Sequence, residues 1–280
     1  MWEIIELSSL AAIPAFLLLA MAVRAQEYVA PKWWKTYATA VTAGTLFVAI
    51  VVTEFWASVF SGPSLIDGAG LGIFGGAAVG ILVYEFIHYW YHRSVHRSDF
   101  LWKKVHQMHH APESFDAFGA YFAHPLDTTL FATWASLVFY PLLGLQPEAG
   151  ILAGAFLGFN ALFQHANIRT PRWLGYIIER PESHSVHHQR HHHRSNYSDL
   201  PLWDIVFGTF DNPVEFASEV GLTPGASKRL GSLLIGRDLS QDARFEDEEA
   251  PDTWREVSFE PSFENVPRSQ EEAASVRSAL

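Results

Sequence analysis

The chain has 280 residues, enough for one large or two small domains. It contains no cysteine, so disulfide bonds and thiolate metal ligands are excluded, and a bound metal must be held by His, Asp, Glu, Asn or water. That set of ligands favours iron, manganese or zinc. The net charge of −11 is concentrated in residues 238–280, which hold 12 acidic and 4 basic side chains. The remainder is nearly balanced and has no basic stripe, so we expect no nucleic-acid partner.

Long apolar runs fill much of the chain before residue 164. The first covers residues 4–23 with Glu6 as its one charged residue, and about 20 apolar residues suffice to cross a bilayer. It lacks the basic region and cleavage site of a signal peptide, so we expect a retained helix. Further runs cover residues 37–60, 71–91, 126–145 and 149–163. They predict an all-α, integral-membrane bundle of about four to five membrane helices. The last pair can instead form a re-entrant hairpin, and a soluble helical protein is the alternative.

Basic residues mark alternate connections between these runs. They occur in residues 24–35, 93–104 and 169–180, whereas residues 61–70 and 144–150 contain no Lys or Arg. Because cytoplasmic loops of membrane proteins are enriched in Lys and Arg, the first set is predicted to be cytoplasmic. The N-terminus then lies outside, and we expect a multi-pass protein with its functional site on the cytoplasmic face.

The composition changes near residue 238, where an acidic segment with Pro and Ser but no hydrophobic periodicity begins. Such a segment cannot bury enough apolar surface to fold, so we expect a disordered tail over residues 238–280. The membrane-embedded domain is predicted to cover residues 1–237. Its histidine-rich core extends over about residues 80–213.

Histidines form two clusters within this core. In the first, His88, His92 and His96 follow an H-x3-H-x3-H pattern that places them on one helix face, and HQMHH supplies His106, His109 and His110. In the second, the H-x2-HH pattern recurs at His184, His187 and His188. There Pro181 and Glu182 indicate a helix start. His165 stands alone at the end of the last apolar run.

Neutral imidazoles at such spacing are typical metal ligands, whereas a lone helical histidine is more often structural. Two histidines from the first helix, the two H-x2-HH triplets and His165 make nine imidazoles. Nine suit two metals with four to five protein ligands each and positions left open for substrate. The two triplets and His165 supply seven of the nine, and one pair among His88, His92 and His96 supplies the others. A cytoplasmic helical cap is therefore expected to hold a dimetal site.

The ordered motifs HYWYHRSVH, LWKKVHQMHH, GAYFAHP, FQHA, HSVHH and NYSDLPLWDIVFGTF resemble the fatty acid hydroxylase (sterol desaturase) superfamily over roughly residues 80–213. The resemblance implies an integral-membrane, non-haem di-iron oxygenase. Its ligands are then nine histidines: His92, His96, His106, His109, His110, His165, His184, His187 and His188. It also implies O2-dependent hydroxylation or desaturation at a C–H bond of a membrane lipid such as a fatty acyl chain or sterol. No side chain beyond the metal ligands is needed as a catalytic group.

Four further positions are possible ligands or supporting residues. Glu85 stands where many members carry Asp, and it can orient a ligand imidazole. His88 resembles the HYW histidine of sterol-methyl-oxidase-like members but lies one turn deeper in the membrane, and His124 matches a histidine found in some members. The run His191–His193 resembles a solvated loop, although metal binding there stays open.

Two electrons per turnover must come from outside, because the sequence contains no haem, flavin or iron–sulfur motif. The resemblance therefore implies a separate ferredoxin, cytochrome or reductase as the donor. One alternative is a membrane metallohydrolase with zinc-activated water, although such sites usually mix carboxylates with histidine. Another is a metal-binding or transport protein, which would carry its polar ligands near mid-membrane. The lipid, the oxidised carbon and the oligomeric state stay open.

Overall fold

The computed structural model describes residues 16–60, 62–192 and 194–240. Most of the first predicted helix and nearly all of the predicted tail lie outside these residues, although residues 16–22 are helical. Within the described residues the fold is helical and contains no strand, apart from one isolated bridge between Gln189 and Val220. The all-α class is thereby confirmed.

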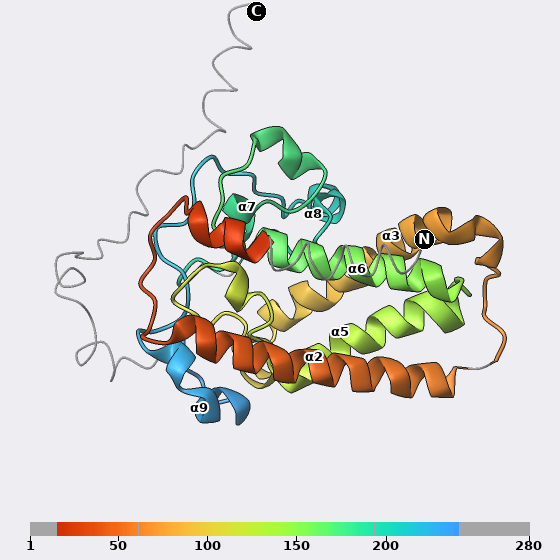
Figure 1. Ribbon diagram of the computed structural model, residues 1–280, viewed down its shortest axis with the longest axis horizontal. Coiled ribbons are helices and arrows are strands. Elements are labelled where there is room, and N and C mark those ends of the chain that lie inside the picture. Colours follow the sequence, from red (N-terminus) through yellow and green to blue (C-terminus); the bar gives the residue numbers. More distant parts are fainter. Residues whose placement is uncertain (1–15, 61, 193, 241–280) are drawn as a thin grey trace, which may run out of the picture. The chain divides into compact units, whose positions relative to one another are not determined.

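Four long helices match the apolar runs. Helices α2 and α3 cover Trp34–Val59 and Gly72–Arg97. Helix α5 covers Pro125–Leu137 and continues as the π-helical turn Val138–Leu142, and α6 covers Pro147–Gln164. Both α5 and α6 begin with proline, whose fixed φ suits the first helical position. In the bundle α3 packs against α6 and α2 packs against α5 (Figure 1).

The two connections that contain no Lys or Arg, residues 61–70 and 144–150, meet at one end of this bundle. The backbone N–H groups of Leu65, Ile66 and Gly68 donate to the carbonyls of residues 141–143 over 2.8, 2.9 and 2.8 Å. Gly144 has φ +58°, and a Cβ there would lie 2.1 Å from Ser64 Oγ. Glycine is therefore required for this close approach.

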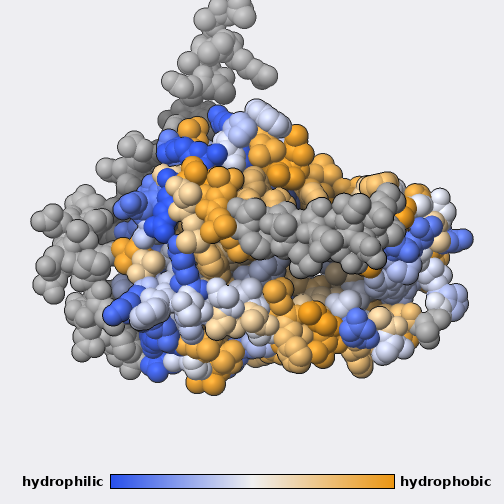
Figure 2. All heavy atoms as spheres, viewed as in Figure 1, coloured by the Kyte–Doolittle hydropathy of each residue, from blue (hydrophilic) through white to orange (hydrophobic). Residues whose placement is uncertain are grey.

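The outward surfaces of the long helices are apolar. On α2 the side chains of Phe47, Ile50 and Phe55 are more than half exposed, as are Phe74 on α3 and Ile151 on α6. Hydrophobic side chains cover much of the visible face of α2, and hydrophilic ones gather toward the histidine-bearing end (Figure 2). Two helices, Trp34–Val59 and Ala69–Arg97, are long and apolar enough to cross a membrane. Extensive exposed apolar surface of this kind is typical of a membrane-facing bundle.

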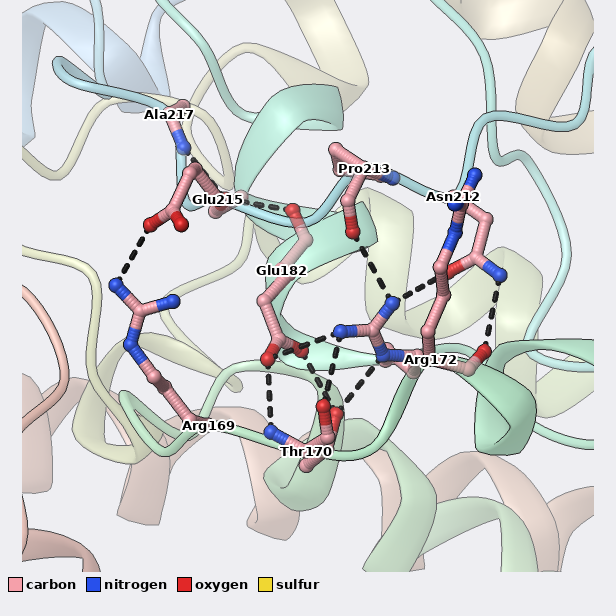
Figure 3. Close-up of polar contacts among 10 residues, drawn as sticks. Arg169, Thr170, Arg172, Glu182, Asn212, Pro213, Glu215 and Ala217 are labelled. Carbon is pink, nitrogen blue, oxygen red and sulfur yellow. Dashed lines mark hydrogen bonds and ion pairs between the residues drawn. The ribbon is translucent and has the colours of Figure 1, made fainter.

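Short elements lie between the long helices and after them. They are the α4 turn and the π-helix that continues it, the later helices α7 to α9, and four 3-10 turns: Asp99–Leu101, Trp102–His106, Pro181–His187, Pro201–Phe207, Leu230–Leu234, Ala69–Leu71, Ala117–Gly119, Arg172–Tyr176 and Ala226–Lys228. The start of α7 is held by a buried ion pair between Arg180 Nη2 and Glu182 Oε1 at 3.0 Å. Glu182 also accepts from the backbone N–H and hydroxyl of Thr170 (Figure 3). Arg180 donates to Asn212. This satisfied network fixes the helix that carries the second histidine cluster.

Candidate metal centre

Helix α3 presents three histidines along one face. The ring centroids of His88 and His92 are 5.4 Å apart, and those of His92 and His96 are 4.9 Å apart. His92 Nε2 lies 3.2 Å from His96 Nε2. The spacing of four residues therefore aligns the rings as the sequence pattern predicts.

The HQMHH segment follows a change of helix type. A π-helix covers Trp102–His106, and turns replace it directly after His106. His110 Nε2 lies 3.2 Å from His106 Nε2, while the His109 ring faces His165 and His188 at 4.9 and 4.8 Å. The three histidines of this segment therefore point in two directions.

Helix α7 divides its histidines in the same way. The His187 ring lies 4.7 Å from both His92 and His96 and 4.8 Å from His110. By contrast, His184 Nε2 lies 3.2 Å from His165 Nε2 and 3.1 Å from His188 Nε2. Each H-x2-HH motif thus sends its first and last histidine to one place and its middle histidine to the other.

All nine predicted ligand histidines come together in two groups. In each group the nitrogen atoms lie within 4.8 Å of one another. The five-histidine group consists of His92, His96, His106, His110 and His187, and the four-histidine group consists of His109, His165, His184 and His188. The expectation of four to five imidazoles per metal matches this division.

The orientation of the rings fits metal binding. His92 Nδ1 lies 2.9 Å from the Tyr197 carbonyl, His165 Nδ1 lies 2.8 Å from that of Ala161, and His187 Nδ1 lies 2.8 Å from that of Ser195. A carbonyl accepts, so the proton is on Nδ1 and the Nε2 lone pair is directed inward. Neighbouring Nε2 atoms lie 3.0 to 3.2 Å apart, as expected for nitrogens about 2.1 Å from a shared cation.

Burial keeps the four-histidine group neutral. Burial, followed by neighbouring imidazoles, lowers the pKa of His109, His184 and His188 well below the usual imidazole value. Burial also lowers the pKa of His165 to about 4. At neutral pH these side chains are unprotonated, which is the form that binds a metal.

A cavity of about 230 Å³ is lined by histidines of both groups. Its other walls combine side chains from all four long helices, among them Leu46, Tyr84, Phe131 and Leu157. The cavity therefore joins the two histidine groups to the interior of the apolar bundle.

A separate, polar cleft of about 820 Å³ reaches the five-histidine group from another direction. His96, Trp102 and Tyr197 line it, together with Arg97 and Lys103. The Trp102 ring lies 5.2 Å from that of His96 and 5.1 Å from that of His110. The five-histidine group thus borders two spaces. His92 and His106 line the apolar cavity, and His96 lines the polar cleft.

The sequence pattern of the fatty acid hydroxylase family matches residues 77–209, the segment that contains all nine histidines. This match and the curated relatives support the fatty acid hydroxylase superfamily. It is 27% identical over 134 residues to sphinganine C4-monooxygenase 1 of Arabidopsis thaliana, a match that covers 46% of this chain and 52% of that protein.

Two other relatives are named for different activities. Very-long-chain aldehyde decarbonylase GL1-9 of Oryza sativa subsp. indica is 29% identical over 139 residues, covering 47% of this chain and 52% of that protein. Alkylglycerol monooxygenase of Homo sapiens is 33% identical over 134 residues, covering 45% and 28%. The chain therefore spans about half the length, or less, of these curated relatives. No solved structure matches it.

The sequence did not single out Asp127, which supports the five-histidine group. His106 Nδ1 lies 2.7 Å from Asp127 Oδ2, and the Tyr91 hydroxyl donates to Oδ1 over 2.7 Å. A carboxylate in this position fixes the ring and makes the opposite nitrogen a stronger donor to a metal. The available signal was a lone acid in the first turn of an otherwise apolar run.

Glu85 and His88 lie outside the two histidine groups and form a third cluster with Asp199. His88 Nδ1 lies 3.3 Å from Glu85 Oε1. Glu85 Oε2 accepts from the backbone N–H of Asp199 and Leu200 over 2.7 and 3.2 Å. Glu85 therefore orients His88 and holds the segment after the second cluster against α3.

The remaining candidate histidines are also outside the two groups. His124 caps α5: its Nδ1 accepts from the Leu126 N–H over 3.1 Å, and its Nε2 lies 3.1 Å from the Leu234 carbonyl. Both ring nitrogens are thus engaged by the backbone. His191 is exposed in a turn with φ +62° and His192 is half-buried, while His193 lies outside the described residues.

Proposed function

We propose that the chain is an O2-dependent, non-haem di-iron hydroxylase or desaturase that acts on a C–H bond of a membrane lipid. The observation that carries this proposal is the cavity of about 230 Å³. Histidines of both groups line it, together with side chains from the inner faces of the four long helices. Family membership and the monooxygenase names of two relatives support an oxidoreductase of lipid metabolism.

The nine histidines are proposed as the protein ligands of two iron ions, five to one ion and four to the other. Bound iron would supply the O2-activating chemistry needed to remove hydrogen from an unactivated C–H bond. The protein contributes orientation: backbone carbonyls and Asp127 fix the rings, and buried side chains exclude water. Because two metals share one cavity, the side chains around it decide which carbon of the substrate approaches them.

Membrane embedding gives the substrate a route to this site. We propose four to five spans, with α2 and α3 among them, and with the histidine groups on the cytoplasmic face. An acyl chain or sterol then enters from the bilayer between the long helices, without crossing water. Electrons come from a separate ferredoxin, cytochrome or reductase. The polar cleft beside His96 and Trp102 is the side from which such a protein can approach the five-histidine group.

The first test is metal content by inductively coupled plasma mass spectrometry on detergent-purified protein from iron-replete cells, with a Mössbauer spectrum of the same sample. About two irons per chain, magnetically coupled when oxidised, is the expected result. Incubation with 18O2, a reductant and extracted membrane lipids should then place label in a hydroxylated lipid, or produce an alkene with labelled water. Zinc that persists under iron-rich growth, without O2 consumption, would contradict the proposal and favour a metallohydrolase.

A further inference from the structure

One wall of the cavity is polar, although the helices around it are apolar. This wall is lined by Tyr84, His88, Gln164 and Asp199, and these residues are 7%, 8%, 6% and 7% exposed. None of the four belongs to the two histidine groups. Buried polar side chains are normally fully hydrogen-bonded, so each unsatisfied atom requires an explanation.

One buried oxygen atom in this wall lacks such a partner. Gln164 Nε2 donates to Asp199 Oδ1 over 3.0 Å, but Gln164 Oε1 is buried and accepts no hydrogen bond from the described residues. His88 lines the cavity beside it and is held through Nδ1 by Glu85 at 3.3 Å. The wall is therefore pre-oriented and incomplete.

A third metal ion is a poor match for this wall. Although Glu85, His88 and Asp199 are close together, both oxygens of Glu85 are already occupied, one by His88 and the other by two backbone N–H groups. Removing Glu85 leaves one imidazole and one carboxylate that is bound to Gln164, which is too few for a stable protein site. A small polar group of an organic ligand fits the arrangement better.

We propose that His88, Gln164 and Asp199 bind a hydroxyl group of the lipid substrate and so determine which carbon faces the two histidine groups. This inference rests on the proposed oxygenase function and specifies its substrate class. A hydroxyl both donates and accepts, so it can donate to the carboxyl or amide oxygen and still pair with the imidazole. An ether or an alkyl group cannot donate and would leave those atoms unpaired.

Two observations favour a hydroxyl over an ammonium group. Burial and the neighbouring Glu85 raise the pKa of Asp199 to about 7, so its carboxyl is not a fully formed anion at neutral pH. Moreover, the wall contains a phenol, an amide and an imidazole as well as the carboxyl. A neutral donor–acceptor group is the better complement to such a mixture.

The position of the wall limits the site of oxidation. His88 precedes His92 by four residues, an axial rise of about 6 Å, and their rings stack at 5.4 Å. A hydroxyl bound at His88 therefore leaves a chain carbon within a few bonds of it beside the five-histidine group. The enzyme is then expected to oxidise carbons close to an existing hydroxyl and to leave distant positions on the same chain unreacted.

The test compares two isomeric probes, 1-octanol and heptyl methyl ether, which have the same atoms but differ in the presence of an O–H group. Their affinities for iron-loaded protein in lipid nanodiscs are measured by isothermal titration calorimetry, with empty nanodiscs subtracted. Wild-type protein should bind 1-octanol at least about tenfold more tightly, because only the alcohol satisfies the polar wall. Equal affinities in the wild type would overturn the proposal without any variant.

Variants then locate the preference. Gln164→Met and His88→Phe keep the side-chain volume but remove hydrogen-bonding atoms, and each should reduce the preference for 1-octanol to within about twofold. Ile151→Met, on the exposed face of the same helix as Gln164, should retain it. A preference that survives both wall variants would contradict the assignment, and so would octylamine binding more tightly than 1-octanol, which would indicate an amine site.

Iron content measured on the same samples separates the two proposals. An alcohol preference in protein that takes up no iron would overturn the oxygenase function and leave the hydroxyl site standing. Two irons per chain with no alcohol preference would overturn the hydroxyl site and leave the oxygenase function standing. Far-ultraviolet circular dichroism of each variant confirms that it remains folded. If a variant does not fold, the comparison of the two probes in the wild-type protein is still decisive.

Discussion

The two histidine groups are built from similar ligands but have different surroundings. The five-histidine group is supported by the Asp127 carboxylate and lines both the polar cleft and the apolar cavity. The four-histidine group lines the cavity through His109, His165 and His184 and is packed against Phe115. Nδ1 of His184 has no hydrogen-bond partner among the described residues. The two groups therefore differ in more than the number of histidines. A supporting carboxylate and a neighbouring polar cleft distinguish the five-histidine group from the four-histidine group.

This difference suggests a division of roles. A carboxylate-supported group near solvent is suited to bind its ion more tightly and to exchange electrons with a donor in the cleft. An enclosed group among neutral rings is suited to hold its ion beside the substrate without competing water. The predictions below test this distinction, beginning with the largest expected effect.

Removing one ligand from either group should abolish activity. His106→Ala and His184→Ala each leave a metal without a central ligand, and we expect iron to fall from about two per chain to one or fewer. Membrane insertion should be unaffected, because neither side chain faces lipid. Metal analysis and 18O incorporation are the measurements, and full activity in either variant would remove that histidine from the proposed ligand set.

Acid should affect the four-histidine group in the metal-free protein. The folded pKa of His165 is about 4 and the unfolded value is 6.5, so between these pH values the unfolded state binds more protons. The His165 contribution to stability is therefore lost as pH falls, by up to about 3 kcal/mol at pH 4. Relative to wild type, His165→Gln should gain about that amount between pH 6.5 and pH 4.

The check is thermal unfolding of both chelator-treated proteins across this pH range. Comparing the two removes the contributions of carboxyl groups that titrate in the same interval. A difference between the two midpoints that does not change with pH would show that His165 is not held neutral by burial.

Asp127→Asn should weaken iron binding selectively at the five-histidine group. The amide keeps the shape of the side chain but cannot accept the His106 proton as a charged partner, and such changes typically cost about 10- to 100-fold in metal affinity. Asp116→Asn is the matched control, since that carboxylate binds Trp34 Nε1 and no histidine. Competition with a chelator measures both, and equal losses in the two variants would contradict a specific role for Asp127.

Deletion of residues 250–280 should have the smallest effect. This segment contains no histidine and therefore supplies no proposed ligand to either group. We expect iron content and lipid oxidation within about twofold of the full chain. An inactive truncated protein with normal iron content would show that the acidic segment acts on catalysis by another route.

The helices whose bounds follow directly from apolar runs and proline positions were predicted correctly. The apolar runs 37–60 and 71–91 correspond to α2 and α3, and the Pro181 start of α7 agrees with the structure. Local periodicity and proline placement carry this information because helix formation depends mainly on nearby residues. The number of membrane spans is still a prediction.

The sequence selected the nine candidate histidines but did not indicate their arrangement in two groups. The nine histidines could be selected by spacing and family resemblance, yet nothing local indicates that His109 and His187 leave their own motif partners. That division depends on the π-helix before His106 and on contacts between residues far apart in sequence. Asp127 and the polar wall at Gln164 and Asp199 were missed for the same reason, since their partners come from other helices.

The exchange of His109 and His187 between the two groups has a thermodynamic consequence. Each H-x2-HH segment contributes to both metal positions, so ordering a segment around one ion also places a ligand for the other. The second ion then encounters a position whose conformational entropy has already been lost, and it should bind more tightly than the first. Partially loaded protein should therefore be a mixture of empty and fully loaded molecules, with few singly loaded ones.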